Sequence, residues 1–325
     1  MTLAALGWTE RRSEEFEPHL GEGLLPGRII GEHRTHYVVA TNTAELNATL
    51  AGRLRNQAGQ RSDLPGVGDF VAIRPAAGDG PATIEAVLLR TTALVRKAAG
   101  EERPQLLAAN VDVIFIVMAL DGDFSLPRLA RYLSLVQSSG ATPVIIANKT
   151  DLSDDVAARI AEIGSAAPGV RVHAITARNT GVARELEKYF DDNRTIALIG
   201  SSGVGKSTLT NQLLGREAQA TQEVRSHDDR GRHTTTHRQL FLRPRGGSVM
   251  DTPGMRGLEL WGSEAKLAPD FADIEALSSQ CKFRNCKHGP EPGCAVRAAI
   301  ERGDLDPVRL ANYVGHTGAS SRSRR

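Results

Sequence analysis

The chain has 325 residues, of which 40% are hydrophobic and 24% are charged, and its formal net charge is +2. This length and composition predict a globular protein of two or three domains with real cores. Because the net charge is close to zero, it gives no argument for nucleic-acid binding. The longest apolar run, "VDVIFIVMAL", is shorter than the roughly 18 residues that a membrane-spanning helix needs. Since the first residues also lack a secretory pattern, we expect a cytoplasmic protein with no membrane partner.

The first hundred residues predict an arm followed by a small closed barrel. Residues 1–35 are polar, with glycines near their end, and we expect a flexible arm. Residues 36–100 contain short β-type runs separated by turn signals and no long helix. The segment "RTTALVRKAAGEERPQ" that ends this part is interpreted as a charged linker. The arginines along these strands are typical of barrels that bind RNA through one face, although solvated strand residues explain them equally well: Arg28, Arg34, Arg53, Arg55, Arg61 and Arg74.

From residue 107 to about 262, apolar strands alternate with helical stretches. This alternation predicts a parallel sheet covered on both faces. The expected strands are "VDVIFIVMAL", "TPVIIANK", "VRVHAITA", "TIALIG", "RQLFLRP" and "GSVMDTP". The expected helices are "LPRLARYLSLVQSS", "VAARIAEIG", "VARELEKYF" and "KSTLTNQLLG".

The segment "GSSGVGKST" matches the phosphate-binding pattern G-x-x-x-x-G-K-[ST] and lies between an expected strand and an expected helix. Glycines allow backbone N–H groups to curl around a phosphate, where the helix N-terminus adds partial positive charge. Lys206 is expected to reach the β- and γ-phosphates, and the Ser207 hydroxyl is expected to bind Mg²⁺. The expected nucleotide-binding residues of this loop are Gly200, Ser201, Ser202, Gly203, Val204, Gly205, Lys206, Ser207 and Thr208.

The segment "NKTD", which follows a strand, predicts that the base is guanine. The carboxylate of Asp151 can accept two parallel hydrogen bonds from guanine, whereas adenine would leave it unpaired. Asn148 is expected to brace the loop, and the stem of Lys149 to lie over the ring. At the end of the next strand, Thr176 and Ala177 are expected to support the guanine O6 through backbone N–H groups.

Between and after these motifs, the sequence offers residues for magnesium and for hydrolysis. Asp251 in "VMDTPG" follows an apolar strand and is expected to hold Mg²⁺, while the Gly254 N–H meets the γ-phosphate. In "GRHTTTHRQL" we favour Thr235 as the residue that reaches Mg²⁺, and His233 as the candidate that positions the attacking water. Met255 stands where many GTPases have a water-orienting Gln, so intrinsic hydrolysis is expected to be slow.

The base-reading motif precedes the phosphate loop, which reverses the usual order. Since the termini of a domain often lie close together, the old ends can be joined and the chain cut elsewhere without loss of the sheet. The motif order therefore predicts a circularly permuted GTPase.

All three cysteines of the chain lie in one segment, with the pattern C-x4-C-x-H-x5-C. An odd number of cysteines argues against a disulfide framework. Three thiolates and one imidazole match a closed, tetrahedral, structural Zn²⁺ site. The expected zinc ligands are Cys281, Cys286, His288 and Cys294.

A small barrel, a permuted GTPase and a Cys3His zinc module in this order resemble the RsgA (YjeQ/YloQ) family, the ribosome small-subunit-dependent GTPases. The resemblance covers nearly the whole chain and rests on "NKTD", "GSSGVGKST", "GRHTTT", "DTPGMRG" and "CKFRNCKHGPEPGCAV". It implies a multidomain fold: an OB-fold β-barrel over residues 36–100, a permuted α/β P-loop GTPase domain over 101–262, and a mostly α-helical zinc-binding domain with a basic tail over 263–325. One departure is "TA" at Thr176 and Ala177, where "SA" is usual in the family.

The resemblance also implies a function. It implies RNA contacts from both flanking domains, GTP hydrolysis stimulated by the small ribosomal subunit, a role in late maturation of that subunit, and a hydrolytic role for His233. The expected partners are thus the small subunit with its rRNA, GTP and GDP, for a chain expected to be a monomer. A nucleotide-gated RNA-binding switch fits Met255 equally well, and a permuted GTPase acting on another RNA or protein client is a further alternative. An ATPase is disfavoured by Asp151.

Overall fold

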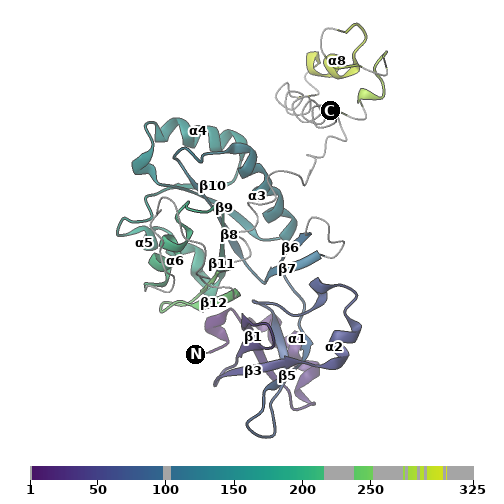
Figure 1. Ribbon diagram of the computed structural model, residues 1–325, viewed down its shortest axis with the longest axis vertical. Coiled ribbons are helices and arrows are strands. Elements are labelled where there is room, and N and C mark those ends of the chain that lie inside the picture. Colours follow the sequence, from purple (N-terminus) through teal and green to yellow (C-terminus); the bar gives the residue numbers. More distant parts are fainter. Residues whose placement is uncertain are drawn as a thin grey trace, which may run out of the picture. The chain divides into compact units, whose positions relative to one another are not determined.

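The computed structural model describes residues 2–97, 104–215, 238–251, 274, 277–283, 286–288, 291–302 and 305. The chain divides into two compact units, Met1–Glu264 and Ala265–Arg325. Figure 1 shows the first unit as a β-barrel, in purple and blue, that adjoins a larger α/β domain in teal and green. In the part of the chain that the structure describes, no helix is long and apolar enough to cross a membrane.

Five short strands form the barrel. They follow the order β1-β2-β3-β5-β4, and β1 also pairs with β4, so the sheet closes on itself. Strands β3 and β5 are parallel, and the other neighbours are antiparallel. Ile29, Val39, Ile73 and Ile84 fill the interior, each 0% exposed. The expected OB-like barrel is therefore confirmed. Its strands are β1 (Leu25–Glu32), β2 (Tyr37–Ala40), β3 (Glu45–Leu50), β4 (Phe70–Arg74) and β5 (Ala82–Val87), with α2 (Gly52–Gln57) and η2 (Arg61–Asp63) between β3 and β4.

The N-terminal segment is folded, which corrects the flexible arm expected over residues 1–35. It forms η1 (Ala4–Leu6) and α1 (Glu10–Leu20), and β1 of the barrel lies within the same range. Phe16 of α1 is buried, and its ring packs edge-to-face against that of Trp8, with 6.0 Å between the ring centroids. Arg12 is buried as well, and its guanidinium donates to Asn110 Oδ1 at 2.8 Å. The segment looks polar because only a narrow side of α1 packs against the barrel.

The segment expected as a charged linker forms a hairpin. Strands β6 (Ala93–Lys97) and β7 (Pro104–Ala109) pair antiparallel. Leu94, Leu106 and Leu107 are buried in the core. The charged residues between the two short apolar runs hide the strand pattern in the sequence.

The α/β domain is built on six strands in the order β10-β9-β8-β11-β13-β12. The first five run parallel to their neighbours, which confirms the predicted parallel sheet for this part. The last strand, β12, differs from the prediction because it runs antiparallel to β13. Only a short turn joins these two strands, and a short connection cannot produce a parallel pair. The strands are β8 (Val113–Ala119), β9 (Thr142–Asn148), β10 (Arg171–Ala174), β11 (Thr195–Ile199), β12 (Arg238–Leu242) and β13 (Ser248–Asp251).

Helices cover both faces of this sheet. Because side chains alternate along a strand, Ile114 and Ile116 of β8 join the core that includes α3, whereas Phe115 and Val117 join the core that includes α6. Figure 1 shows α5 and α6 on one side of the strands and α3 on the other. The helical elements are α3 (Leu126–Ser139), η3 (Thr150–Leu152), α4 (Val156–Ala166), α5 (Val182–Glu185), η4 (Glu187–Asn193) and α6 (Lys206–Leu214).

The second unit has a small core of its own around helix α8 (Ala295–Glu301). Val296 and Ala299 of this helix are fully buried and cluster with Ile274 and Leu305. The helix follows the cysteine-rich stretch, as the sequence predicts. The basic tail lies outside the described residues.

Candidate functional site

The phosphate loop connects β11 to α6 and depends on glycine. Gly200 has φ +144°, and a Cβ there would lie 2.0 Å from the carbonyl oxygen of Val117. Gly205 has φ +98°, and a Cβ there would lie 2.2 Å from Asn148 Nδ2. Both distances are far below van der Waals contact, and both φ values disfavour residues with a side chain. These two glycines therefore allow the loop to turn tightly between neighbouring strands.

Lys206 is the first residue of α6, and its ammonium group lies inside the loop. Its Nζ donates to the carbonyl oxygen of Gly200 at 2.6 Å and also to that of Ser201. The N-terminus of the nine-residue helix α6 adds partial positive charge at the same place. The loop thus gathers a lysine charge and a helix N-terminus, which is the arrangement that binds phosphate groups.

Asn148, the last residue of β9, links the base-reading loop to two other loops. Its Nδ2 donates to the carbonyl oxygen of Val204 in the phosphate loop at 2.7 Å. Its Oδ1 accepts from the backbone N–H of Ala177 at 2.8 Å. The side chain is 2% exposed, so both hydrogen bonds are shielded from water. One buried amide therefore holds together the three segments that the sequence assigns to base, phosphates and guanine O6.

Lys149 is held by an acidic residue that sequence reasoning missed. Lys149 has a left-handed backbone, with φ 61°, and its Nζ donates to Asp121 Oδ2 at 2.7 Å. Burial by itself would raise the pKa of Asp121, but the hydrogen bond from Lys149 and a backbone N–H outweigh it and lower that pKa. Asp121 comes soon after β8, and its place at the carboxyl edge of the sheet is the signal that could have revealed it.

Asp151 is exposed and is oriented by Thr176. The Thr176 hydroxyl donates to Asp151 Oδ1 at 3.0 Å, and the hydroxyl groups of Thr150 and Thr176 are 2.8 Å apart. In the "TA" pair of this chain, the Thr176 hydroxyl thus donates to the carboxylate of Asp151, while the backbone N–H of Ala177 donates to Asn148 Oδ1. This use of Thr176 was not expected from the sequence.

A second residue that sequence reasoning missed is Arg128 of α3. Its Nη1 donates to the buried hydroxyl of Ser201 and, at 2.6 Å, to Asp123 Oδ2. These groups line a small pocket behind the phosphate loop. Arg128 therefore supports the loop from the side of the sheet core.

The remaining nucleotide residues follow from strand order. Strands β11 and β13 are parallel neighbours, with Ala197 opposite Met250, so Asp251 at the end of β13 lies at the same sheet edge as the phosphate loop. Ser202, Gly203, Ser207 and Thr208 lie in or directly after that loop. The sequence-predicted residues His233, Thr235 and Gly254 lie outside the described residues.

In the second unit, the four expected zinc ligands converge. One ligand atom from each of Cys281, Cys286, His288 and Cys294 lies within 4.8 Å of all the others. His288 Nδ1 is 3.8 Å from Cys281 Sγ and 3.5 Å from Cys294 Sγ. Its Nε2 lies 3.1 Å from the hydroxyl of Ser278, which leaves Nδ1 as the ligand atom. Three sulfurs and one imidazole at this spacing fit a tetrahedral Zn²⁺ ion.

Backbone groups also favour the thiolate form of Cys281. Burial alone would raise the pKa of Cys281, but hydrogen bonds from the backbone N–H groups of Ala295 and Val296 help to lower it. These N–H groups belong to the start of α8. A lowered thiol pKa favours metal binding, because the ligand is the thiolate, but the pKa of Cys286 in the same cluster is raised, to about 11, so this help is limited to Cys281.

Comparison with known proteins agrees with this geometry. The sequence pattern of the RsgA GTPase family matches residues 87–261. The chain is 44% identical to the small ribosomal subunit biogenesis GTPase RsgA of Opitutus terrae, over 96% of this chain and 88% of that protein. It is 44% identical to the small ribosomal subunit biogenesis GTPase RsgA 2 of Lactiplantibacillus plantarum, over 90% of this chain and 82% of that protein.

Two solved structures share the fold. The crystal structure of YjeQ from Thermotoga maritima superimposes with a TM-score of 0.60 at 27% identity, covering 90% of this chain and 97% of that one. The structure of YloQ, described as a circularly permuted GTPase, gives a TM-score of 0.56 at 28% identity, covering 93% and 97%. The predicted circular permutation is thereby confirmed, and the chain belongs to the RsgA GTPase family.

Proposed function

We propose that this chain is a GTPase that binds the small ribosomal subunit, hydrolyses GTP in a subunit-stimulated manner and assists late maturation of that subunit. The observation that carries the proposal is the bridge that Asn148 makes between the base-reading loop and the phosphate loop. The names of the relatives, which are small ribosomal subunit biogenesis GTPases, support the choice of partner. We place the protein in the cytoplasm as a monomer with GTP, GDP and small-subunit rRNA as its ligands.

Guanine selection follows from the carboxylate of Asp151. It would accept hydrogen bonds from the ring N–H and the exocyclic amine of guanine, which adenine does not offer together. Thr176 fixes the orientation of that carboxylate, and Lys149 is steadied by Asp121 so that its stem lies over the ring. Ala177 stays the candidate for the guanine O6, and because its backbone N–H is donated to Asn148 Oδ1, that contact would be a shared hydrogen bond. We therefore expect strong discrimination against ATP.

The phosphates would be bound by the loop from Gly200 to Thr208, with Lys206 as the cation. The candidate magnesium ligands are hydroxyl and carboxylate oxygens, the donors that this hard cation prefers: Ser207, Thr235 and Asp251. When bound, Mg²⁺ supplies charge neutralisation at the β- and γ-phosphates. Gly254 would donate its backbone N–H to the γ-phosphate.

Hydrolysis needs a group that orients the attacking water. Met255 follows "DTPG" in the sequence and has no polar atom able to do so. We assign this role to His233, whose imidazole can accept a hydrogen bond from water. Because a single loop residue would orient the attacking water, we expect slow intrinsic hydrolysis that a partner accelerates.

The second unit would hold one structural Zn²⁺. Cys281, Cys286, His288 and Cys294 supply four ligands, which leaves no open position for catalytic water. The ion would stabilise the small core around α8. This role is structural and separate from GTP hydrolysis.

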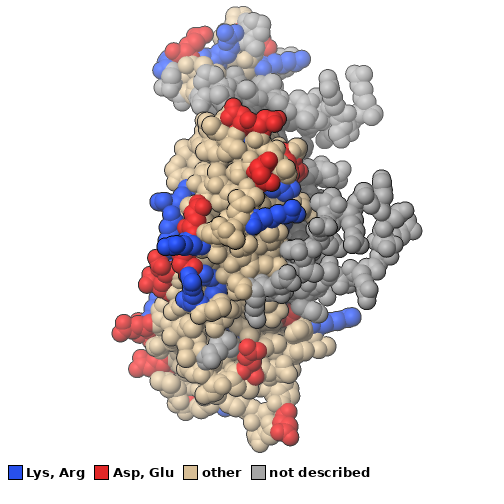
Figure 2. Space-filling model, turned by 90° about the vertical axis from the view of Figure 1, so that its left-hand side faces the viewer, with Lys and Arg blue, Asp and Glu red and all other residues tan. Residues whose placement is uncertain are grey.

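Contact with rRNA would come from both flanking domains. Arg28 does not contribute, because it is 1% exposed. Arg53 and Arg74 both pair with Glu85, at 3.1 and 3.2 Å, so their charge is partly neutralised. On the face drawn in Figure 2, basic side chains are interspersed with acidic ones rather than gathered into one patch. Among the barrel arginines, the exposed Arg34 and Arg55 are expected to contribute to the RNA contact.

The test is GTP hydrolysis by the purified protein alone, with small ribosomal subunits and with large subunits. We expect strong stimulation by small subunits only, and loss of guanine selectivity in the Asp151→Ala variant. Slow hydrolysis that neither subunit changes would contradict the proposal and favour a nucleotide-gated RNA-binding switch. Stimulation by a different RNA or protein would favour another client.

A further inference from the structure

Strand β12 lies between the barrel and the strand that ends at Asp251. On one edge β12 pairs with β13, and Gln239 stands opposite Asp251. On the other edge β12 pairs with β1 of the barrel, and Gly31 stands opposite the same Gln239. Backbone pairing thus runs in one row from the barrel to Asp251. The lateral position of Asp251 depends on β12, and β12 is held by β1.

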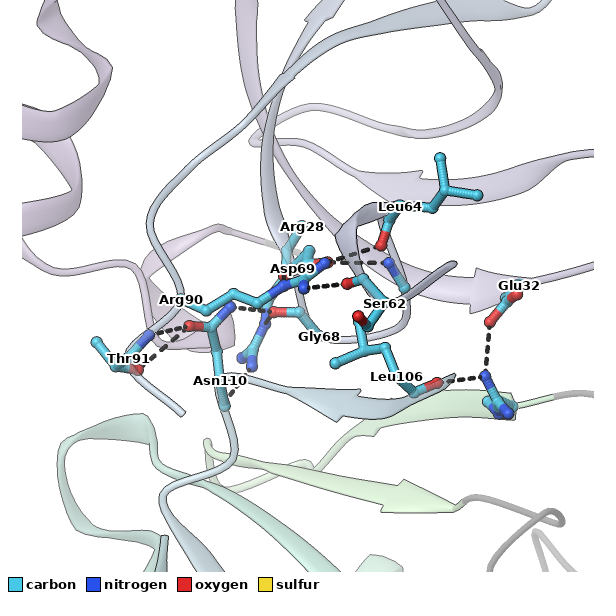
Figure 3. Close-up of polar contacts among 12 residues, drawn as sticks. Arg28, Glu32, Ser62, Leu64, Gly68, Asp69, Arg90, Thr91, Leu106 and Asn110 are labelled. Carbon is cyan, nitrogen blue, oxygen red and sulfur yellow. Dashed lines mark hydrogen bonds and ion pairs between the residues drawn. The ribbon is translucent and has the colours of Figure 1, made fainter. Parts of the chain in front are cut away.

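Arg238, the first residue of β12, ties the start of this strand to two elements outside the α/β sheet. Its Nη1 donates to the carbonyl oxygen of Leu106 in β7 at 2.9 Å and to Glu32 Oε2 in β1 at 3.2 Å. Figure 3 labels the two acceptors of these hydrogen bonds, Glu32 and Leu106. The side chains of Arg238 and Glu32 are only 16% and 29% exposed, so solvent screens this ion pair less than a surface pair.

The barrel side of this connection is itself fixed to the α/β domain. Arg28 of β1 is buried, and its guanidinium donates to Thr195 Oγ1 of β11 at 2.8 Å, to the Asn110 carbonyl at 3.0 Å and to the Gly68 carbonyl at 3.2 Å. Figure 3 shows Arg28, Gly68 and Asn110 close together. Gly68 has φ +96°, and a Cβ there would lie 2.0 Å from the Ala109 carbonyl oxygen. This close packing leaves β1 little freedom relative to β11.

Burial lowers the pKa of Arg28 to about 10, so its guanidinium is still charged at neutral pH and keeps its buried acceptors. A charged, fully buried guanidinium that lost these acceptors would be strongly unfavourable. The barrel strand to which Arg238 is attached is therefore held to the α/β domain by a charged, buried side chain.

We propose that Arg238, through its contacts with Glu32 and Leu106, is a positioning residue for Asp251, and hence for magnesium-dependent nucleotide binding. The pair acts through β12: it fixes the start of that strand against the barrel, and the β12–β13 pairing fixes the backbone of Asp251. The inference rests on the proposed function, because it takes Asp251 as a magnesium ligand. It adds that the barrel, in addition to any RNA contact, supports the nucleotide site from the side.

The test measures the affinity of the full-length protein for GDP in excess EDTA and across a Mg²⁺ titration. Arg238→Ala is expected to raise the Mg²⁺ midpoint by about fivefold, at the lower end of ordinary coupling between sites. Glu32→Ala is expected to raise it by about twofold, as for the loss of one partly exposed ion pair. The affinity in EDTA should be unchanged in both variants. Glu32→Gln keeps an acceptor oxygen but loses the charge, so its midpoint is expected to lie between those of Glu32→Ala and the wild type. Arg159→Ala, which removes a more exposed ion pair to Glu162 on α4, is the control for the loss of an arginine charge far from β12.

The outcomes separate the inference from the proposed function. An unchanged Mg²⁺ midpoint in both Arg238→Ala and Glu32→Ala overturns the inference. An equal loss of affinity with and without Mg²⁺ also overturns it, because that pattern marks general loosening of the fold. If Asp251→Ala keeps the wild-type Mg²⁺ dependence, the proposed magnesium site is wrong, whatever Arg238 does.

Discussion

Replacement of Asn148 by Ala tests the bridge on which the candidate site depends. The variant removes two hydrogen bonds, of 2.7 Å to the Val204 carbonyl and 2.8 Å to the Ala177 N–H. Val204 and Ala177 are 2% and 3% exposed, so water cannot easily replace the lost partner. An unsatisfied buried polar group costs about 1–3 kcal/mol. Two such groups, allowing for relaxation of the loops, give a loss of about 2–4 kcal/mol.

If this loss appears in nucleotide binding, GDP affinity falls roughly 30- to 700-fold, since about 1.4 kcal/mol corresponds to a factor of ten. Calorimetric titration with GDP measures the affinity, and thermal unfolding without nucleotide measures how much of the loss falls on the fold. Asn56→Ala, an exposed Asn on α2, is the matched control. Wild-type GDP affinity in Asn148→Ala, together with wild-type stability, would refute the argument that this amide assembles the site.

Two further predictions concern charge and metal. Asp121→Asn should weaken GDP binding by roughly threefold to tenfold, as expected for the loss of a charge-assisted hydrogen bond to Lys149, measured by the same titration. The pKa of Asp121 is lowered in the folded state, so its contribution to the free energy of unfolding is present above the ordinary carboxyl pKa and is lost as the pH falls through the lowered value. Only the wild type should therefore lose this part of its stability in acid. Removal of zinc with a chelator, or the Cys294→Ser variant, should unfold the second unit while GDP affinity is retained, because structural zinc contributes about 10–16 kcal/mol to such small folds. Metal analysis and circular dichroism measure the zinc content and the folding of this unit. A second unit that stays folded without metal would contradict the prediction.

Much of the fold could be predicted where the pattern is local. The strand β11, the glycines after it and the helix α6 are consecutive in sequence, so their pattern is readable without knowledge of the tertiary structure. The hairpin β6–β7 was missed because a charged turn interrupts two short apolar runs. Helix α1 was missed because its burial depends on partners far along the chain. Arg12 is hydrogen-bonded to Asn110, and Phe16 packs against residues of the barrel. Such partners are set by the tertiary fold.

The same division applies to the candidate site. Asn148, Asp151 and Lys206 were predicted because the chemistry of guanine and phosphate demands those residue types at fixed spacing. Asp121 and Arg128 were missed because they act on other protein residues and belong to no spacing pattern. Each lies in the segment that follows β8 and contacts a loop from another part of the chain. Supporting residues of this kind become visible only when the strand order is known.

The permuted order leaves the site intact because its contacts depend on strand order in the sheet and not on chain order. Asn148 reaches Val204 because β9, β8 and β11 are successive parallel neighbours whose carboxyl ends share one edge. Permutation changes what is attached to that sheet. The barrel joins at the outer edge of β12, and the chain that leaves β13 at Asp251 leads toward the second unit. Both attachments are therefore on the strands of the phosphate side, while the guanine-reading strands β9 and β10 carry neither. A partner that binds the barrel or the second unit is thus connected first to the strands that carry Asp251 and the phosphate loop, which we propose to bind magnesium and the phosphates.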